Sequence, residues 1–191
     1  VSFAIPPGGR MGLVGESGSG KSMTALALMG LLPMGWGTKG EVLHDGADLS
    51  KLSDKALSSK RGRTISMVFQ DPLSSLNPVR RVGDQISWVI RRHMGVDKAE
   101  AQLQTIALMT QMHLPRPEQL VRAYPHEISG GQRQRIMIAM ALACYPQLII
   151  ADEPTTALDV TVQKQVLRLL NSAVSERGSA LLMITHDLPI I

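Results

Sequence analysis

The 191-residue sequence predicts one α/β domain with a mainly parallel sheet. The first observation behind this prediction is a set of four short apolar runs, each of which ends abruptly in a polar residue. The second is that helical patterns lie between these runs. Uninterrupted apolar runs are typical of strands buried on both faces, as in a parallel sheet covered by helices. Ligands gather at the carboxyl ends of such strands, so we expect the polar residues to meet at one edge of the sheet.

The expected strands are defined by the residues that end them. They are 11–14 before Gly15, 65–69 before Gln70, 148–151 before Asp152 and Glu153, and 180–184 before Thr185 and His186. Alternating apolar and small residues predict a further strand at residues 1–5. Because the chain begins inside that strand and stops just after Pro189, we expect it to be an excerpt of a longer protein.

Three helices are expected between the strands, at residues 21–32 before Pro33, 132–144 before Pro146 and 160–177 before Gly178. Residues 71–145 contain five prolines among helix formers but no buried-strand run, which predicts a helical subdomain inserted into the core. The α/β core would then consist of residues 1–70 and 146–191. Residues 40–52, with a turn at Asp45 and Gly46, are expected to form a small antiparallel hairpin.

Composition restricts the classes of function. Hydrophobic residues make up 44% of the chain, enough for a sizeable core, but only 3% are aromatic, too few for a stacking platform for single-stranded nucleic acid. The net charge of +4 fits an anionic ligand or surface without identifying either. The single cysteine, Cys144, excludes an intrachain disulfide and suits a reducing compartment. No apolar run is long enough to span a membrane.

Residues 15–22 match the pattern G-x-x-x-x-G-K-[ST] in full and lie between an expected strand and an expected helix. They are Gly15, Glu16, Ser17, Gly18, Ser19, Gly20, Lys21 and Ser22. The glycines let successive backbone N–H groups turn toward phosphate oxygens, and the helix N-terminus adds partial positive charge. Lys21 is expected to reach the β and γ phosphates and the Ser22 hydroxyl to ligate Mg²⁺. The flanking elements favour a P-loop NTPase over an ordinary glycine-rich turn.

Two further motifs carry chemistry. Asp152 is expected to hold Mg²⁺ through its water shell, and Glu153 to deprotonate the water that attacks the γ-phosphate. The alternative is a solvated acidic pair at the start of a helix, with Pro154 in its first turn. Residues 129–132 precede a helix with Ser129 in the N-cap position, and the alternative there is an ordinary cap with flexible glycines. A second glycine-rich helix N-terminus would provide a second anion site.

These motifs resemble the ATPase domain of ATP-binding cassette (ABC) transporters in order and approximate spacing. The resemblance covers essentially the whole chain and rests on the phosphate loop, Gln70, Ile128-Ser129-Gly130-Gly131-Gln132, Asp152-Glu153, Ala157-Leu158-Asp159 and His186. Residues 70–78 are similar, more particularly, to the ATPase subunits of dipeptide, oligopeptide and nickel importers. Ile128 stands where leucine is usual, a change that conserves side-chain volume. Met23 stands where threonine is common, so a side-chain hydroxyl near the α-phosphate is lost. The aromatic residue that stacks on adenine would lie before Val1.

The resemblance implies a head-to-tail dimer of cassettes, identical or different, with two ATP molecules at the interface. Residues 129–132 would contact the γ-phosphate held by the partner, and Asp159 would lie at the dimer seam. Gln70 would contact Mg²⁺ and the attacking water and link the site to the helical subdomain. His186 would contact the γ-phosphate and act with Glu153.

The same resemblance implies a Mg²⁺-dependent ATPase on the cytoplasmic face of the inner membrane. It would drive uptake of peptides, or of a related solute such as nickel, through separate permease subunits that an extracytoplasmic solute-binding protein supplies. A cassette ATPase acting on nucleic acid is a rival. The stretch between Gln70 and Ser129 is too short for a long coiled coil, and one cysteine excludes zinc modules, but a tandem-cassette ribosomal protein stays open. A P-loop GTPase or kinase is rejected, because no Asn-Lys-x-Asp guanine motif is present and such proteins have no use for residues 129–132.

Other residues have plainer interpretations. Arg133 and Arg135 are interpreted as a solvated or phosphate-facing helix edge. Two pairs of arginines are interpreted as surface charge that would meet anionic lipid or an acidic loop. Four methionines at helical spacing are predicted to fill the core. The pairs are Arg80-Arg81 and Arg91-Arg92, and the methionines are Met109, Met112, Met137 and Met140.

Overall fold

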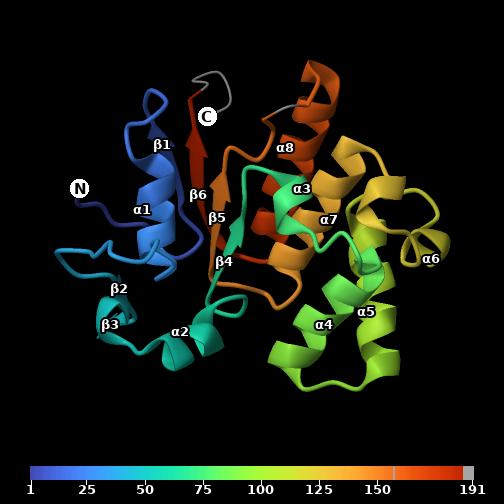
Figure 1. Ribbon diagram of the computed structural model, residues 1–191, viewed down its shortest axis with the longest axis horizontal. Helices are drawn as coiled ribbons and strands as arrows, with labels where there is room; N and C mark the ends of the chain where they lie inside the picture. Colours follow the sequence, from blue (N-terminus) through green and yellow to red (C-terminus); the bar gives the residue numbers. More distant parts are fainter. Residues whose placement is uncertain (157, 187–191) are drawn as a thin grey trace.

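The computed structural model describes residues 1–156 and 158–186. Its centre is a four-stranded, wholly parallel sheet (Figure 1). The strands across the sheet are β1 (Arg10–Val14), β6 (Ala180–Thr185), β5 (Leu148–Asp152) and β4 (Ile65–Val68). The four predicted strands are therefore confirmed, and each bound that differs does so by one residue.

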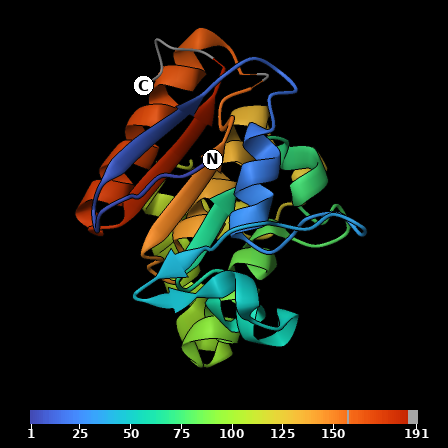
Figure 2. The same ribbon diagram turned by 90° about the vertical axis from the view of Figure 1, so that its left-hand side faces the viewer.

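Both faces of the sheet are covered by helices, which explains the continuous apolar runs. Ile149, Leu181 and Met183 pack into a core with α7 (Gly130–Leu142) and α8 (Val160–Glu176). The alternate residues Ile150 and Leu182 pack instead with α1 (Lys21–Leu28). Figure 2 shows α1 on one side of the strands and α8 on the other. Each strand residue thus buries its side chain whichever way it points.

The chain between β4 and β5 is helical in its described residues. Helix α4 shows why, because Val82, Ile86 and Ile90 form an apolar stripe that is fully buried against α5 and α7. Met109, Met112 and Met137 are buried as predicted, and Met140 is packed against the same core. The elements that precede α7 are α3 (Pro72–Ser75), α4 (Val82–Met94), α5 (Lys98–Gln111), α6 (Pro117–Leu120) and the 3₁₀ turn η2 (Pro125–Glu127).

Helices α7 and α8 match the predicted ranges 132–144 and 160–177 to within two residues at each end, but two other predictions differ more from the structure. Residues 1–5 form no strand with any described residue. Their alternation of apolar and small residues fits a strand, but no described strand pairs with them. Helix α1 ends at Leu28, not residue 32, because Gly30 adopts a left-handed φ of 62° and the Leu31 N–H turns back to the Leu26 carbonyl oxygen. The helix is therefore ended by Gly30, three residues before Pro33.

The predicted hairpin is confirmed. Strands β2 (Leu43–His44) and β3 (Ala47–Asp48) pair antiparallel around Asp45 and Gly46, both of which have positive φ. Positive φ at both central residues is the geometry of a tight hairpin turn. The 3₁₀ turn η1 (Leu49–Lys51) and helix α2 (Asp54–Lys60) then lead to β4. Among the described residues, no helix is both long and apolar enough to cross a bilayer.

Candidate active site

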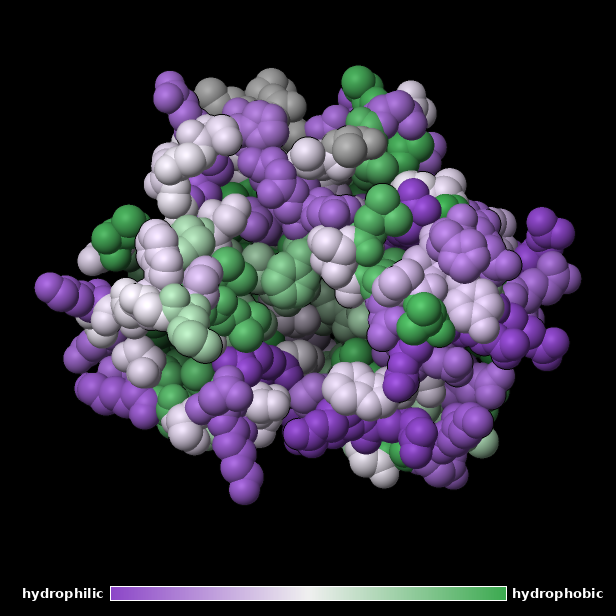
Figure 3. Space-filling model, viewed as in Figure 1, coloured by the Kyte–Doolittle hydropathy of each residue, from purple (hydrophilic) through white to green (hydrophobic). Residues whose placement is uncertain are grey.

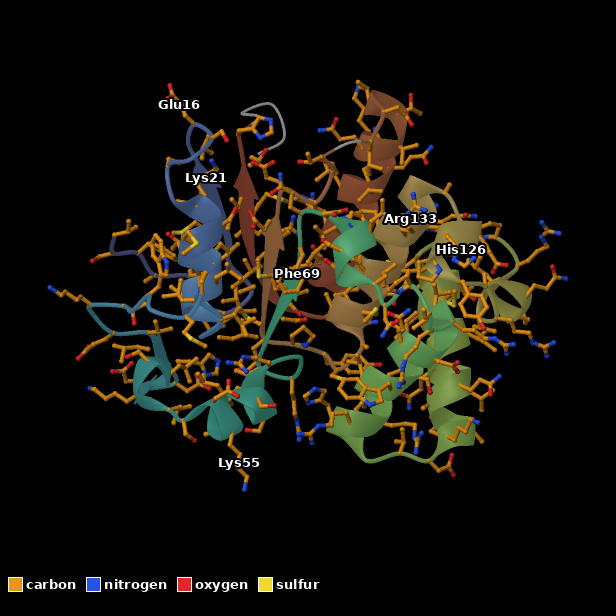
Figure 4. All side chains as sticks on the ribbon, in the orientation of Figure 1. Glu16, Lys21, Lys55, Phe69, His126 and Arg133 are labelled. Carbon is orange, nitrogen blue, oxygen red and sulfur yellow. The ribbon has the colours of Figure 1, made fainter. Side chains whose placement is uncertain are left out.

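The phosphate loop joins β1 to α1, as its motif predicts. Gly18 and Gly20 have φ of 80° and 89°, a left-handed backbone that other residues rarely adopt. Lys21 begins α1 and is 8% exposed, and its Nζ donates hydrogen bonds to the carbonyl oxygens of Gly15 (2.7 Å) and Glu16 (2.8 Å). Figure 4 shows the Glu16 side chain directed away from the fold, while Lys21 lies against the loop. The ammonium group is thus held inside the turn that the motif predicts to bind phosphate.

Asp152 and Ser22 meet at the carboxyl end of β5. The Ser22 hydroxyl donates to Asp152 Oδ1 at 3.1 Å, and Asp152 is 4% exposed. Burial raises the pKa of Asp152, and the negative charge of Glu153 raises it further, whereas the Ser22 hydrogen bond and the Lys21 charge partly oppose this. No described residue forms an ion pair with Asp152. A buried carboxylate beside a hydroxyl, with no salt-bridge partner, fits an oxygen-ligated cation such as Mg²⁺.

Glu153 is held by three donors from different segments. Gln70 Nε2 and Thr156 Oγ1 donate to its Oε2 at 3.0 and 2.9 Å, and His186 Nδ1 lies 2.9 Å from its Oε1. Burial alone would raise the pKa of Glu153, but the hydrogen bonds from His186 and Thr156 outweigh it, so the pKa is lowered. At neutral pH Glu153 is therefore an oriented carboxylate, able to accept a proton from water.

The backbone of Glu153 is itself unusual. Its φ of 45° lies in the left-handed region, and its N–H donates to the Ile184 carbonyl oxygen at 2.9 Å, which extends the β5–β6 contact. Strained conformations of this kind cluster at functional sites, where the surroundings enforce them. The turn it starts brings Thr156 back onto the carboxylate. Thr156 was not predicted as a site residue from the sequence, where its only signal is a hydroxyl side chain three positions after Glu153 in a proline-containing turn.

The polar residues that follow β1, β4, β5 and β6 meet at one edge of the sheet, as predicted. The structure does not bring residues 129–132 into this cluster. Ser129 Oγ accepts from the Gln132 N–H at 3.3 Å and Gln132 Oε1 accepts from the Ser129 N–H at 2.9 Å, so the two residues form a reciprocal capping box on α7. Figure 4 places Lys21 and Arg133, which is on α7, on opposite sides of the sheet. The predicted N-cap is thus confirmed.

Asp159 and the two arginines after the capping box also have intramolecular roles. Asp159 caps α8 by accepting from the N–H groups of Thr161 and Val162. Arg133 Nη1 donates to the carbonyl oxygens of Pro125 and Ile128, and Arg135 donates to His113 and Gln165. Both arginine side chains are partly exposed, so their interpretation as a solvated or phosphate-facing helix edge stays a prediction, to which the structure adds these hydrogen-bond partners. Ala157 lies outside the described residues.

Comparison with known proteins gives the family. The family model described as "ABC transporter" matches residues 1–156. The chain belongs to the ABC transporter family. The fold agrees, because the chain is similar to the ATP-binding cassette MJ0796, solved as a dimer in a post-hydrolysis state with ADP and Pi. That similarity has a TM-score of 0.85 and 29% identity, and covers 98% of this chain and 79% of that one.

Curated relatives of the cassette are named as ATP-binding proteins of transport systems. Over its whole length the chain is 49% identical to the oligopeptide transport ATP-binding protein OppD of Salmonella typhimurium, covering 57% of that protein. It is 50% identical to the peptidoglycan transport ATP-binding protein YejF of Agrobacterium fabrum and 49% identical to the probable D,D-dipeptide transport ATP-binding protein DdpD of Escherichia coli, covering 35% and 59% of them. The chain thus spans about a third to three-fifths of these relatives.

Proposed function

We propose that this cassette hydrolyses ATP to drive uptake of peptides, or of a related solute such as nickel, through separate membrane subunits. The proposal rests on the cluster of side chains at one edge of the sheet. This cluster contains Lys21 in the phosphate loop, the Ser22–Asp152 pair, and Glu153 with its three hydrogen-bond donors. An anion-binding loop, a cation pair and an oriented base are the parts that phosphoryl transfer to water requires. The peptide-transport relatives indicate the solute class.

In the proposed mechanism the chain supplies positioning and one base. Lys21 would exchange its two loop carbonyls for the β and γ phosphates of ATP, and Ser22 and Asp152 would hold Mg²⁺. The bound Mg²⁺ would supply charge neutralisation on the phosphates. Glu153 takes the proton of the attacking water, while Gln70 and His186 keep its carboxylate in place. His186, held at Nδ1, keeps Nε2 available for the γ-phosphate.

The second anion site requires a partner cassette. Because Ser129 Oγ accepts from Gln132 N–H, its hydroxyl hydrogen remains available to donate to a phosphate oxygen. The phosphate loop of the same chain lies across the sheet, so we propose that Ser129–Gln132 meet the nucleotide of a second cassette in a head-to-tail dimer, identical or different, with Asp159 near the seam. The dimeric state of the related cassette MJ0796 supports this arrangement.

A basic groove supports docking of a permease subunit. It has a volume of about 420 Å³ and is lined by four cationic side chains, Asp84 and two aromatic residues, of which Trp88 is 57% exposed. None of the four cations forms an ion pair with a described residue. Figure 3 shows hydrophilic side chains over the helical half of the molecule beside a central hollow with hydrophobic lining. An acidic loop with apolar residues fits such a surface. The cations are Arg80, Arg81, Arg91 and Lys98.

The ATPase proposal is tested with Glu153→Gln and Lys21→Ala in the full-length protein. Glu153→Gln should bind ATP with unchanged affinity, lower kcat by roughly two to three orders of magnitude because the base is lost, and accumulate ATP-bound dimers. Lys21→Ala should weaken ATP binding itself. Undiminished ATP turnover by the Glu153→Gln variant would show that Glu153 is not the general base.

Docking is tested by reversing charge in the groove. The double variant Arg80→Glu/Arg81→Glu should lose co-purification with the permease and solute uptake, while ATP hydrolysis by the isolated subunit persists. Lys55→Glu/Lys164→Glu, which changes the same charge on exposed residues elsewhere, is the matched control. Equal co-purification of both double variants with the permease would show that the groove is not the docking surface.

A further inference from the structure

Arg133 turns back from the first turn of α7 to the segment that precedes this helix. Its Nη1 donates to the Pro125 carbonyl oxygen at 3.0 Å and to the Ile128 carbonyl oxygen at 2.8 Å. These two carbonyls bracket η2 (Pro125–Glu127), and Ile128 is the residue directly before Ser129. One guanidinium nitrogen therefore joins the helix to both ends of the turn that leads into the capping box. Hydrogen bonds from a charged donor are about twice as strong as neutral ones.

The turn that Arg133 contacts also has interactions of its own. Glu127 Oε2 accepts from the Tyr124 N–H at 2.7 Å, and the rings of Tyr124 and His126 stack with their centroids 5.7 Å apart. Its position relative to α7 is set at the junction beside Ser129. Arg133 spans that junction, so its two hydrogen bonds tie the turn to α7 beside Ser129.

Arg133 also lies beside the segment that carries Gln70. Helix α3, which starts directly after Asp71, packs against α7. The pKa of Asp71 is lowered first by the hydrogen bond from the Leu73 N–H, and in smaller part by the positive charge of Arg133. A single side chain thus lies between the residue next to Gln70 and the turn before Ser129.

We propose that Arg133 is a positioning residue that fixes the turn before Ser129, so that Ser129 is presented correctly to the nucleotide of the partner cassette. This inference rests on the proposed head-to-tail dimer. It makes Arg133 act in trans: its loss impairs the site that contains the partner's phosphate loop and leaves the nucleotide affinity of its own loop intact. Lys21 and Arg133 lie on opposite sides of the sheet, which is why the two effects separate (Figure 4).

The first test compares Arg133→Ala, Arg133→Lys and the control Arg122→Ala in the full-length protein. Arg122 is exposed and its side chain forms no hydrogen bond with a described residue. Arg133→Ala should lower kcat by about 10- to 100-fold, the scale expected for a displacement near 1 Å, with ATP affinity of the monomer changed less than about twofold. Arg133→Lys should recover most of kcat, because an ammonium group also donates to two carbonyls. Equal kcat of Arg133→Ala and Arg122→Ala would overturn the inference.

The second test uses complementation between two impaired variants. Mixing Arg133→Ala with Lys21→Ala creates one site built from an intact phosphate loop and an intact signature turn, so hydrolysis should return to the level given by Ser129→Ala mixed with Lys21→Ala. If the Ser129→Ala mixture recovers activity and the Arg133→Ala mixture does not, Arg133 supports its own chain only and the inference is wrong. If the Ser129→Ala mixture fails as well, the head-to-tail dimer of the proposed function is wrong. Melting temperatures confirm that each variant folds.

Discussion

The contact between α7 and α8 at Gly131 allows a prediction whose size follows from the structure. A Cβ atom at Gly131 would lie 2.8 Å from Val162 Cγ1, whereas carbon atoms in favourable contact are about 3.5–4.0 Å apart. Val162 has little freedom to move away, because its N–H is bonded to Asp159 and a β-branched side chain in a helix has one preferred rotamer. Gly131→Ala should therefore force the two helices apart.

The neighbouring glycine provides a matched control. A Cβ at Gly130 would meet Leu158 Cδ2 at 3.8 Å and Arg133 Nη2 at 3.9 Å, both ordinary contacts. Gly130→Ala should leave stability unchanged or raise it by up to about 1 kcal/mol, since glycine weakens a helix by that amount. Gly131→Ala gains the same helix propensity, but the overpacking against Val162 costs about 1–3 kcal/mol. The net effect is a destabilisation of the fold on the order of 1 kcal/mol.

The assay is thermal unfolding of both variants, where 1 kcal/mol corresponds to roughly 2–4 °C for a chain of this size. Gly131→Ala should melt below the wild type and Gly130→Ala at or above it. Val162→Ala removes the opposing methyl group, so the double variant Gly131→Ala/Val162→Ala should be more stable than the sum of the single effects, with a coupling of about 1 kcal/mol. Additive single effects, or equal melting of the two alanine variants, would refute the close approach.

Three further predictions concern single side chains. Thr156→Val should lower kcat by several-fold because Glu153 loses one of its three donors, and Thr156→Ser should restore it; equal kcat for Val and Ser would contradict this. Burial raises the pKa of Asp152, so the ionised carboxylate destabilises the folded state at pH values above that pKa. Asp152→Asn should therefore raise the melting temperature of the metal-free protein at pH 7. The same variant should no longer be stabilised by MgATP. Cys144 is buried and its pKa is raised, so alkylation measured by mass spectrometry should be at least about tenfold slower in folded than in unfolded protein.

The sequence predicted the sheet and its ligand-binding edge because both depend on local patterns. A strand buried on both faces is visible in the sequence as an apolar run, without knowledge of its neighbouring strands. Each of the four runs is followed by a residue of the polar cluster at the sheet edge. The phosphate loop was recognised for a similar reason, since its glycine positions are required by the backbone itself. Where two local signals competed, the prediction failed: Gly30 ended α1 before Pro33 did.

Contacts that depend on an unusual backbone conformation or on helix packing could not be predicted from the sequence. The bond from Thr156 to Glu153 depends on a left-handed backbone at a glutamate, which no propensity favours. The role of Arg133 depends on where η2 lies relative to α7, and that position is set by packing of the whole helical segment. Arg133 and Arg135 look alike in the sequence, yet one joins a turn to its own helix and the other joins α7 to His113, which follows α5, and to α8.

The two halves of the proposed composite site differ in how their polar groups are satisfied. Lys21 is bonded to loop carbonyls and Glu153 to three side chains, so the hydrolytic half is assembled before any partner arrives. Ser129 and Gln132 are satisfied by each other, so the signature half needs no ligand to keep its shape. A partner's nucleotide would therefore meet a preformed donor and little ordering would oppose closure. On this reasoning the α7 N-terminus changes little on dimer formation, and the tight Gly131–Val162 contact, together with Arg133, keeps it in place.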